Sequence, residues 1–414
     1  LGDPLGGADE VLVLGGEVAR QSFGRGALQE GSSYELNIIS MFRSVTKYQA
    51  EIVNANSALS ILRKAINTAM SGRKRPVLVT LPVDIALQDI GIVAESGSFA
   101  HNLSIDKTTL SGLMDRISEA RRPMLLAGSG VRSAGAASLL TQFVEKYSIP
   151  SATTMKAKGV IPESHSLSLG TYGFGGSGLV NSYLKGGIDY LIAIGCGLGD
   201  ITTNNWNEEL KPKKLFIQID IDGEKISRNF PAHVSIIGDA RQILSELLEY
   251  DAKKYISYDE IQERNKFLHT LKTEHIPSVQ HPAPNESDIC LKPHIVIQKL
   301  QHAFPSTTVF IADIGEHLAF AIHYLRIDLP DAFITNAGFG SMCSGIGTAI
   351  GAKLGYRDMR PVLCICGDGG MLMNGTEIST CVKYQIPIVF AVFNDGRLNM
   401  VYHGHTADFG RCPD

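Results

Sequence analysis

The sequence lacks several features that would assign it to a narrow class at once. Its 414 residues contain no apolar run near the roughly 20 residues needed to span a bilayer, and no signal peptide. The seven cysteines have no metal-ligand spacing, and the formal net charge of −4 gives no general basis for binding nucleic acid or acidic membranes. We therefore expect a cytoplasmic globular protein that binds neither nucleic acid nor a membrane.

Two common catalytic motifs are missing as well. The segment "GSGVRS" lacks the Lys-Ser/Thr pair of a Walker motif, and no Gly-x-Ser-x-Gly nucleophile elbow occurs with plausible partners. Cys364 and Cys366 lie two apart in an apolar run, which puts both on one face of a strand. We interpret them as small core residues in a reducing cytosol.

Short apolar runs rich in β-branched residues alternate with amphipathic helical stretches along the whole chain. This alternation is typical of parallel sheets covered by helices on both faces. The fold class is therefore α/β, with three doubly wound parallel-sheet domains. The 42 glycines indicate many tight turns near ligands bound by the backbone.

Composition divides the chain into four segments. Residues 1–92 form a partial N-terminal domain, residues 108–250 a central domain, and residues 285–414 a partial C-terminal domain. The charged, proline-punctuated stretch 251–284 is expected to be a linker. Both ends look truncated, because the chain starts without methionine beside a strand and stops soon after its richest motif.

The stretch "GDGGMLMNGTEISTCVKYQIPIVFAVFND" links two acidic strand ends. Asp368 follows the apolar run "VLCIC", and Asn394 and Asp395 follow "IPIVFAVF". Ligands of open parallel sheets bind beyond the carboxyl ends of the strands, so both ends should face one site. Two carboxylates with a backbone carbonyl and phosphate oxygens suit octahedral Mg²⁺, and the helix after Asp368 would turn its first amides toward a phosphate.

This stretch resembles the metal and diphosphate motif of the thiamine-diphosphate (ThDP) enzymes, in which Gly-Asp-Gly precedes a more distant Asn or Asp. The resemblance implies that Asp368 and Asp395 bind Mg²⁺ by their side chains and that Arg397 adds its main-chain oxygen. Many relatives have Asn where Asp395 stands, and both residues are oxygen donors. The diphosphate would lie on a glycine loop, formed by Gly367, Gly369 and Gly370.

Two further motifs resemble the acetohydroxyacid (acetolactate) synthase group of that family. "DIGEH" is similar to the loop that contacts the diphosphate, which assigns Glu316 and His317 to cofactor binding. "GFGSMCSGIGTAIGAKLG" is similar to the group's Gly-rich turn and helix, which includes Gly340. In it, Met342 matches the apolar residue that bends the cofactor so that its N4′ reaches the thiazolium C2. Taken alone, Met342 would be core filler.

The first block, "GRGALQE" followed by "FRSVTKY", resembles the Gln-Glu and Thr-Lys segment of the same group. The resemblance implies that Gln29 lies near the reacting centre as a hydrogen-bonding group and that Lys47 attracts a substrate carboxylate. Without it, both are solvated loop residues. The family's activating glutamate lies upstream of this chain, and neither Glu17 nor Glu30 takes its place.

The second block resembles the central domain that holds FAD in acetohydroxyacid synthases, and ADP or nothing in related enzymes. Gly128 and Gly130 would approach the nucleotide and Asp220 would bind its ribose; the alternative is ordinary strand-end turns. The family's arginine after the strand that ends in "GCGLGDITTNN" is missing here. Its absence weakens the expectation of FAD and of pyruvate or 2-ketobutyrate as the acceptor.

The resemblance implies a ThDP- and Mg²⁺-dependent carboligase that decarboxylates a 2-keto acid, with pyruvate expected, and joins the enamine to a second carbonyl. It also implies self-association as a homodimer or homotetramer, because the family's site lies between subunits. His403 and His405 would lie near its mouth as proton relays, or on a solvated loop. One alternative is a ThDP-dependent decarboxylase of a 2-keto acid or CoA thioester. Another is a catalytically silent nucleotide-binding scaffold.

Overall fold

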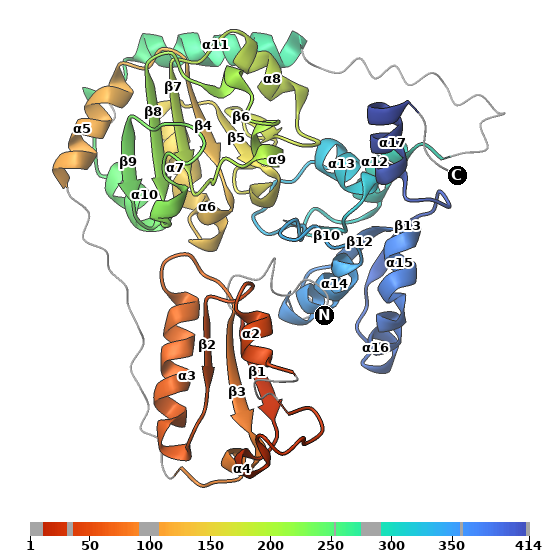
Figure 1. Cartoon of the computed structure of the whole chain (residues 1–414). Coiled ribbons are helices and arrows are strands. Elements are labelled where there is room, and N and C mark those ends of the chain that lie inside the picture. The colour runs from red at the N-terminus through yellow and green to blue at the C-terminus, as the bar shows by residue number, and fades with distance from the viewer. Residues whose placement is uncertain are drawn as a thin grey trace. The chain divides into compact units, whose positions relative to one another are not determined.

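A computed structural model of the chain describes residues 11–30, 36–90, 107–251, 254–274, 291–356 and 359–410. The chain divides into two compact units between residues 104 and 105, and each unit is described by itself. The first unit has one sheet and the second has two, and every strand pairs in parallel with its neighbours (Figure 1). The parallel α/β fold predicted from the alternating pattern is confirmed.

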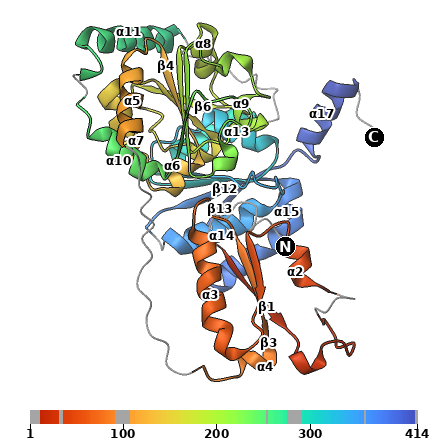
Figure 2. The same cartoon turned by 60° about the vertical axis from the view of Figure 1, so that its left-hand side comes forward.

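The first unit has a three-stranded sheet of order β1-β3-β2. Its elements are β1 (Leu12–Glu17), η1 (Arg20–Ser22), α2 (Ile38–Phe42), β2 (Tyr48–Glu51), α3 (Ala55–Met70), β3 (Val77–Pro82) and α4 (Val83–Ala86). Helix α3 packs along the sheet (Figure 2). Its N-cap is Asn54, whose side chain accepts a hydrogen bond from the Ser57 amide.

The central domain of the second unit has a six-stranded sheet of order β6-β5-β4-β7-β8-β9. The strands are β4 (Pro123–Ala127), β5 (Ser151–Thr154), β6 (Ser168–Tyr172), β7 (Tyr190–Ile194), β8 (Leu215–Asp220) and β9 (Val234–Ile237). The helices are α5 (Lys107–Ser118), α6 (Ser129–Ser133), α7 (Ala137–Tyr147), η2 (Met155–Ala157), α8 (Gly178–Lys185), α9 (Asp200–Thr203), η3 (Glu208–Leu210), η4 (Gly223–Lys225), α10 (Ala240–Leu248) and α11 (Tyr258–Glu274).

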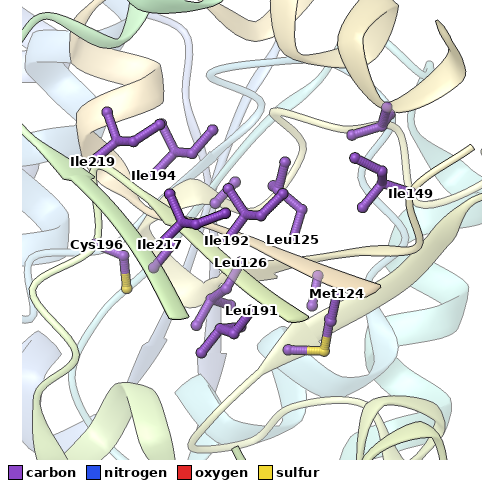
Figure 3. Close-up of a cluster of buried hydrophobic side chains, with 14 of the residues drawn as sticks. Met124, Leu125, Leu126, Ile149, Leu191, Ile192, Ile194, Cys196, Ile217 and Ile219 are labelled. Carbon is purple, nitrogen blue, oxygen red and sulfur yellow. The ribbon is translucent and has the colours of Figure 1, made fainter. Parts of the chain in front are cut away.

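Strands β4, β7 and β8 are buried along their whole length. This burial explains their continuous apolar runs, because a parallel strand covered on both faces has no solvent side. Figure 3 shows side chains of these strands, such as Leu126, Ile192 and Ile217, in one cluster. The cluster is the largest core of the second unit and gives its sheet a rigid carboxyl edge.

The C-terminal domain of the second unit has a four-stranded sheet of order β11-β10-β12-β13. Its strands are β10 (Val309–Ala312), β11 (Phe333–Ile334), β12 (Val362–Gly367) and β13 (Val389–Phe393). The helices are α12 (Pro293–Ala303), α13 (Glu316–Tyr324), α14 (Ser344–Tyr356), α15 (Asp368–Asn374), η6 (Gly375–Glu377), α16 (Ile378–Lys383) and α17 (Asn399–Phe409).

Alternate residues of β10 face two different cores. Phe310 and Ala312 pack with α13, whereas Val309 and Ile311 pack with α14 and with Cys364 and Cys366 of β12. The two cysteines are buried on one face, as predicted. Helices therefore cover both faces of this sheet, and its carboxyl edge is left for the loops that follow β10, β12 and β13.

The expected linker, 251–284, contains helix α11. Leu268 of this helix is buried in the central core, and the Arg264 guanidinium donates to the Tyr147 carbonyl at 3.0 Å. This part of the segment therefore packs onto the central domain. Its charged residues conceal a narrow apolar stripe, which composition alone does not show. Residues 252–253 and 275–284 lie outside the described residues, and the domain boundaries remain predictions.

Every helix within the described ranges is too short or too polar to cross a membrane.

Candidate active site

The carboxyl ends of β12 and β13 form the centre of the candidate site. The two strands are neighbours, and Gly367 is paired with Phe393 at their ends. Asp368 begins α15; its Oδ1 accepts the Gly369 amide at 2.9 Å and its Oδ2 accepts the Gly396 amide at 3.1 Å. The second bond links the loop after β12 to the loop after β13. The two acidic strand ends therefore meet at one edge of the sheet.

Asp395 lies in the loop that follows β13. Its Oδ1 accepts the Arg397 amide at 3.2 Å, and its Oδ2 accepts the side-chain amide of Asn399. The main-chain carbonyl of Arg397 accepts the Asn399 amide at 3.1 Å. The guanidinium of Arg397 lies 4.9 Å from the centre of the Tyr402 ring. The guanidinium is thus engaged elsewhere, and the Arg397 main chain is the part that lies beside the carboxylate.

His317 is the most informative side chain at this edge. It is buried at the start of α13, and its Nε2 has no hydrogen-bond partner among the described residues. Burial lowers the pKa of its imidazole, while the charges of Asp313, Asp395 and Asp368 oppose that shift. A buried ring nitrogen without a partner is costly unless a ligand supplies one. Its position among the carboxylates suits a bound anion that is accompanied by a cation.

Asp313, at the end of β10, organises the Gly-rich turn and was not predicted to have a role of its own. It is 1% exposed, and its two oxygens accept the Cys343 amide at 2.8 Å and the Gly345 amide at 2.9 Å. A carboxylate at the start of α14 also favours the helix dipole. The sequence signal was an aspartate directly after a buried strand. The sequence could not show which amides it binds.

The Gly-rich turn and the glycine loop lie against each other. A side chain at Gly370 would place its Cβ 2.5 Å from Asp313 Oδ2, and one at Gly369 would lie 3.1 Å from Met342 Cε. The hydrogen-bonded Asp313 carboxylate therefore excludes a side chain at Gly370, whereas at Gly369 only the flexible ends of Met342 and Leu398 approach closely. Met342 is half-buried above Gly369, and Gly340 has a φ of +69° in the turn that precedes it. The structure thus brings the predicted residues of both motifs together.

Glu316 has a partner in α17. Its Oε1 lies 3.0 Å from Nδ1 of His403, and both side chains are partly exposed. The predicted cofactor residue and one of the two predicted proton-relay histidines therefore form a pair. His405 lies on the same helix.

Gln29 belongs to the first unit and is exposed, with a left-handed φ of 62°. Next to it, Glu30 is buried, and its carboxylate accepts the amides of Gly24, Gly26 and Ala27. A carboxylate in such a nest of amides fixes the loop, and the loop presents Gln29 to solvent. The structure thus gives Glu30 a local role in shaping this loop, which sequence reasoning missed.

Lys47 lies where β2 begins, at the edge opposite the carboxyl ends of the strands. Its ammonium donates to the carbonyls of Ser71 at 2.5 Å and Arg73 at 3.0 Å, just beyond α3. A cation suits these carbonyls because the end of a helix leaves carbonyls without internal partners. This contact offers a structural role for Lys47. Its attraction of a substrate carboxylate stays a prediction.

The three predicted nucleotide residues lie at the carboxyl edge of the central sheet. A Cβ at Gly128 would lie 2.1 Å from the Gly195 carbonyl oxygen, and one at Gly130 would lie 2.6 Å from Gly195 Cα. Asp220 is buried, and its Oδ1 accepts the Asp222 amide at 2.9 Å. Packing between two strand-end loops thus accounts for both glycines without a nucleotide.

The donor set at Asp368 and Asp395 fits a metal that shares its ligands with phosphate. Within the described ranges, no group of three or more His, Cys, Asp and Glu residues could hold a metal ion. Two carboxylates leave most positions of octahedral Mg²⁺ for main-chain, water and phosphate oxygens. The buried His317 Nε2 beside them fits the accompanying anion. The residues therefore fit Mg²⁺ together with a diphosphate.

Comparisons with known proteins agree with this geometry. The family model described as "Thiamine pyrophosphate enzyme, central domain" matches residues 110–247, and the one described as "Thiamine pyrophosphate enzyme, C-terminal TPP binding domain" matches residues 313–412. The second match contains His317, Met342 and both aspartates of the site. The first covers the six-stranded sheet.

Curated relatives cover nearly the whole chain. A probable acetolactate synthase large subunit of Methanococcus aeolicus is 31% identical over 420 residues, which cover 97% of this chain and 68% of the relative. The acetolactate synthase isozyme 3 large subunit of Escherichia coli (strain K12) is 29% identical over 399 residues, with 94% and 67% covered. The chain belongs to the thiamine pyrophosphate enzyme family, within its acetolactate synthase group.

Proposed function

We propose that the protein is a ThDP- and Mg²⁺-dependent carboligase. It decarboxylates a 2-keto acid, with pyruvate as the expected donor, and joins the remaining two-carbon unit to a second carbonyl. The names of its relatives, acetolactate synthase large subunits, support this reaction class. A cytoplasmic location stays a prediction from the sequence.

One observation carries the proposal. The Asp368 carboxylate accepts the Gly396 amide across two strand ends, beside a buried His317 nitrogen without a partner among the described residues. Two carboxylates at the ends of neighbouring strands repel each other unless a cation compensates their charge. A divalent cation and a diphosphate would compensate their charge and also give His317 its missing partner.

Bound ThDP would supply the electron sink on which the keto acid loses carbon dioxide. The chain's own residues would bind and orient the metal ion and the cofactor. Asp368, Asp395 and the Arg397 carbonyl would hold Mg²⁺, while the amides of Gly369 and Gly370 and the imidazole of His317 would hold the diphosphate. The Met342 side chain would form an apolar support beside the glycine loop and keep water away. The loop of Gln29, in the first unit, would offer a hydrogen-bonding group to the substrate.

The acceptor is the least determined part of the reaction. The stretch "GCGLGDITTNN" has no arginine, although the family usually carries one there, so a decarboxylase of a 2-keto acid or CoA thioester is the alternative. FAD or ADP in the central domain is a separate proposal, since packing already explains Gly128 and Gly130. The absorbance spectrum of the purified protein, and nucleotide release on denaturation, would decide it.

We also propose self-association into a homodimer or homotetramer. Large apolar side chains in α15, in α16 and just beyond it are exposed, including Leu372 at 87%, Val382 at 74% and Tyr384 at 64%. Exposed apolar groups of this size often mark contact surfaces. Sedimentation velocity over a range of protein concentrations would test this proposal, and a monomer at every concentration would contradict it.

Calorimetric titration of ThDP with Mg²⁺ into the whole protein tests the cofactor site. We expect Mg²⁺-dependent binding that is lost in Asp368→Ala and Asp395→Ala and retained in Asp408→Ala, which removes an exposed carboxylate elsewhere in the C-terminal domain. Product analysis with pyruvate then separates the reactions: acetolactate supports the carboligase, and acetaldehyde supports the decarboxylase. Absence of ThDP binding to the parent protein would refute the enzyme proposal.

A further inference from the structure

A buried lysine–glutamate pair lies in the central domain of the second unit. The side chain of Lys158 is 2% exposed and that of Glu163 is 7% exposed. The Lys158 ammonium lies 2.6 Å and 2.8 Å from the two carboxylate oxygens of Glu163. Two charges remain in so dry a place only when each compensates the other and further hydrogen bonds satisfy both. The further hydrogen-bond partners of Lys158 and Glu163 show which segments the pair joins.

Two of these partners belong to the C-terminal domain. The Lys158 ammonium donates to the Ile322 carbonyl at 2.9 Å, and the Glu163 carboxylate accepts the Ile327 amide at 2.8 Å. The Glu163 amide also donates to the Ile327 carbonyl at 3.1 Å. Ile322 lies in the last turn of α13, where carbonyls have no partner inside the helix and attract a cation. Lys158 therefore caps this helix from another domain.

The central domain contacts α13 at a second place. A Cβ at Gly175 would lie 3.0 Å from the Ala319 carbonyl oxygen, and Nδ1 of His323 lies 3.1 Å from the Gly176 carbonyl oxygen. The loop of residues 173–176 thus lies along the helix, and Lys158 holds its end. Both contacts come from residues outside the C-terminal domain. The orientation of α13 (labelled in Figure 1) therefore depends on contacts from the central domain as well as on its packing within the C-terminal domain.

The other end of α13 carries Glu316 and His317. We propose that Lys158 and Glu163 are positioning residues for the cofactor, because they fix the orientation of α13 and with it the place of the His317 imidazole. This inference rests on the proposed function, in which His317 binds the diphosphate. It assigns to the central domain a role in cofactor binding that requires no nucleotide of its own.

The charge of the pair makes the inference testable. Burial lowers the pKa of Lys158, and the nearby Glu163 carboxylate opposes that shift. Removal of one partner leaves a buried charge without compensation, whereas removal of both leaves none. A variant that lacks both charges should therefore recover stability. It still lacks the bond from the Lys158 ammonium to the Ile322 carbonyl, so α13 stays without its cap.

Four variants of the full chain test this: Lys158→Met, Glu163→Gln, the double variant, and Arg264→Met as a control. Arg264 is also buried, and its guanidinium donates to carbonyls of the central domain, those of Tyr147, Ser148 and Ala120. We would measure the thermal midpoint, the dissociation constant of ThDP with Mg²⁺ well below that midpoint, and hydrogen exchange of α13 amides without cofactor.

We expect both single variants to lower the midpoint, to weaken ThDP binding at least tenfold and to speed exchange in α13. The double variant should recover most of the midpoint but keep at least fivefold weaker binding and fast exchange. Arg264→Met should lower the midpoint alone. Recovery of affinity together with the midpoint, or an unchanged affinity in Lys158→Met, would overturn the inference. If the parent protein binds no ThDP, the proposed function fails. The inference about α13 is then tested by hydrogen exchange alone, and equal exchange rates of the α13 amides in Lys158→Met and Arg264→Met would overturn it.

Discussion

Replacement of Asp313 by asparagine should destabilise the second unit and weaken the binding of ThDP. The carboxylate is 1% exposed and accepts two amides, those of Cys343 and Gly345, at 2.8 Å and 2.9 Å. Asparagine has nearly the same shape but offers only one acceptor oxygen. Its amide nitrogen must then face an N–H group, and one buried donor loses its partner.

The size of the effect follows from these two bonds. A hydrogen bond to a charged group contributes about 1.5–3 kcal/mol, and a buried donor without a partner costs about 1–3 kcal/mol. We therefore expect a loss of about 2–4 kcal/mol. For residues 105–414, an unfolding entropy of roughly 2.1 cal/mol/K per residue makes about 1 kcal/mol shift the thermal midpoint by roughly 1.5 °C, so the midpoint should fall by roughly 3–6 °C. Calorimetric scans of the parent and the variant would measure it.

The same substitution should affect the cofactor because the two amides start α14 and follow Met342. Once they are released, the turn that carries Met342 can move away from the glycine loop, so ThDP affinity should fall at least fivefold at a temperature where the variant is folded. Asp331→Asn is the matched control, because Asp331 is a partly exposed aspartate of the same domain whose salt bridge with Arg132 is at 3.7 Å. A midpoint within 1 °C of the parent and unchanged affinity for Asp313→Asn would refute the reasoning.

Three further predictions concern other buried or capped groups. Lys47→Met should destabilise the first unit by about 1–2 kcal/mol in denaturant unfolding, because the contacts with the Ser71 and Arg73 carbonyls are lost. A raised KM for the keto acid at unchanged stability would instead favour a role of Lys47 in attracting the substrate carboxylate. Glu30→Gln should destabilise the loop of Gln29 by about 1–3 kcal/mol, because three amides share its carboxylate; proteolysis between residues 20 and 30 should accelerate, and an unchanged rate would contradict this. Burial raises the pKa of Tyr147 from 10.0 to about 12, so the folded state keeps a proton that the unfolded state loses. The stability this provides is complete below pH 10 and decreases as the pH rises toward 12, by up to about 1.4 kcal/mol per pH unit; unfolding curves of Tyr147→Phe should show a smaller decrease over that range.

The strands and the centre of the site could be predicted from local sequence. Runs such as "VLCICGDGG" combine continuous apolar residues with a polar end, and a parallel sheet places such ends at one edge. The loops that follow β12 and β13 meet as that rule predicts, and the bond between Asp368 and the Gly396 amide joins them. Asn54 likewise marks the start of α3 through a short-range cap, which a sequence pattern contains in full.

Contacts between distant segments could not be predicted. Lys47 meets carbonyls beyond α3, Asp313 meets amides of a later turn, and Lys158 meets α13, each at a separation set by the fold. The residue types permit these contacts but do not select their partners, since a lysine or aspartate has many possible hydrogen-bond partners. Helix α11 was interpreted as a linker for another reason. Its apolar stripe is narrow, and the buried Arg264 looks like a surface residue in the sequence.

Cofactor binding and substrate choice depend on different parts of this chain. The groups proposed to hold Mg²⁺ and the diphosphate all lie in the C-terminal domain. Buried bonds from Asp313 of that domain, and from Lys158 and Glu163 of the central domain, reach the elements that carry these groups. The groups proposed to contact the substrate lie elsewhere, as in the exposed loop of Gln29, or are missing, as is the arginine after "GCGLGD". A buried network resists change because each member satisfies another, whereas an exposed loop tolerates substitution. It follows that the cofactor site supports ThDP chemistry on a 2-keto acid, and that the substrate-contacting groups decide whether the two-carbon unit is joined to an acceptor or protonated.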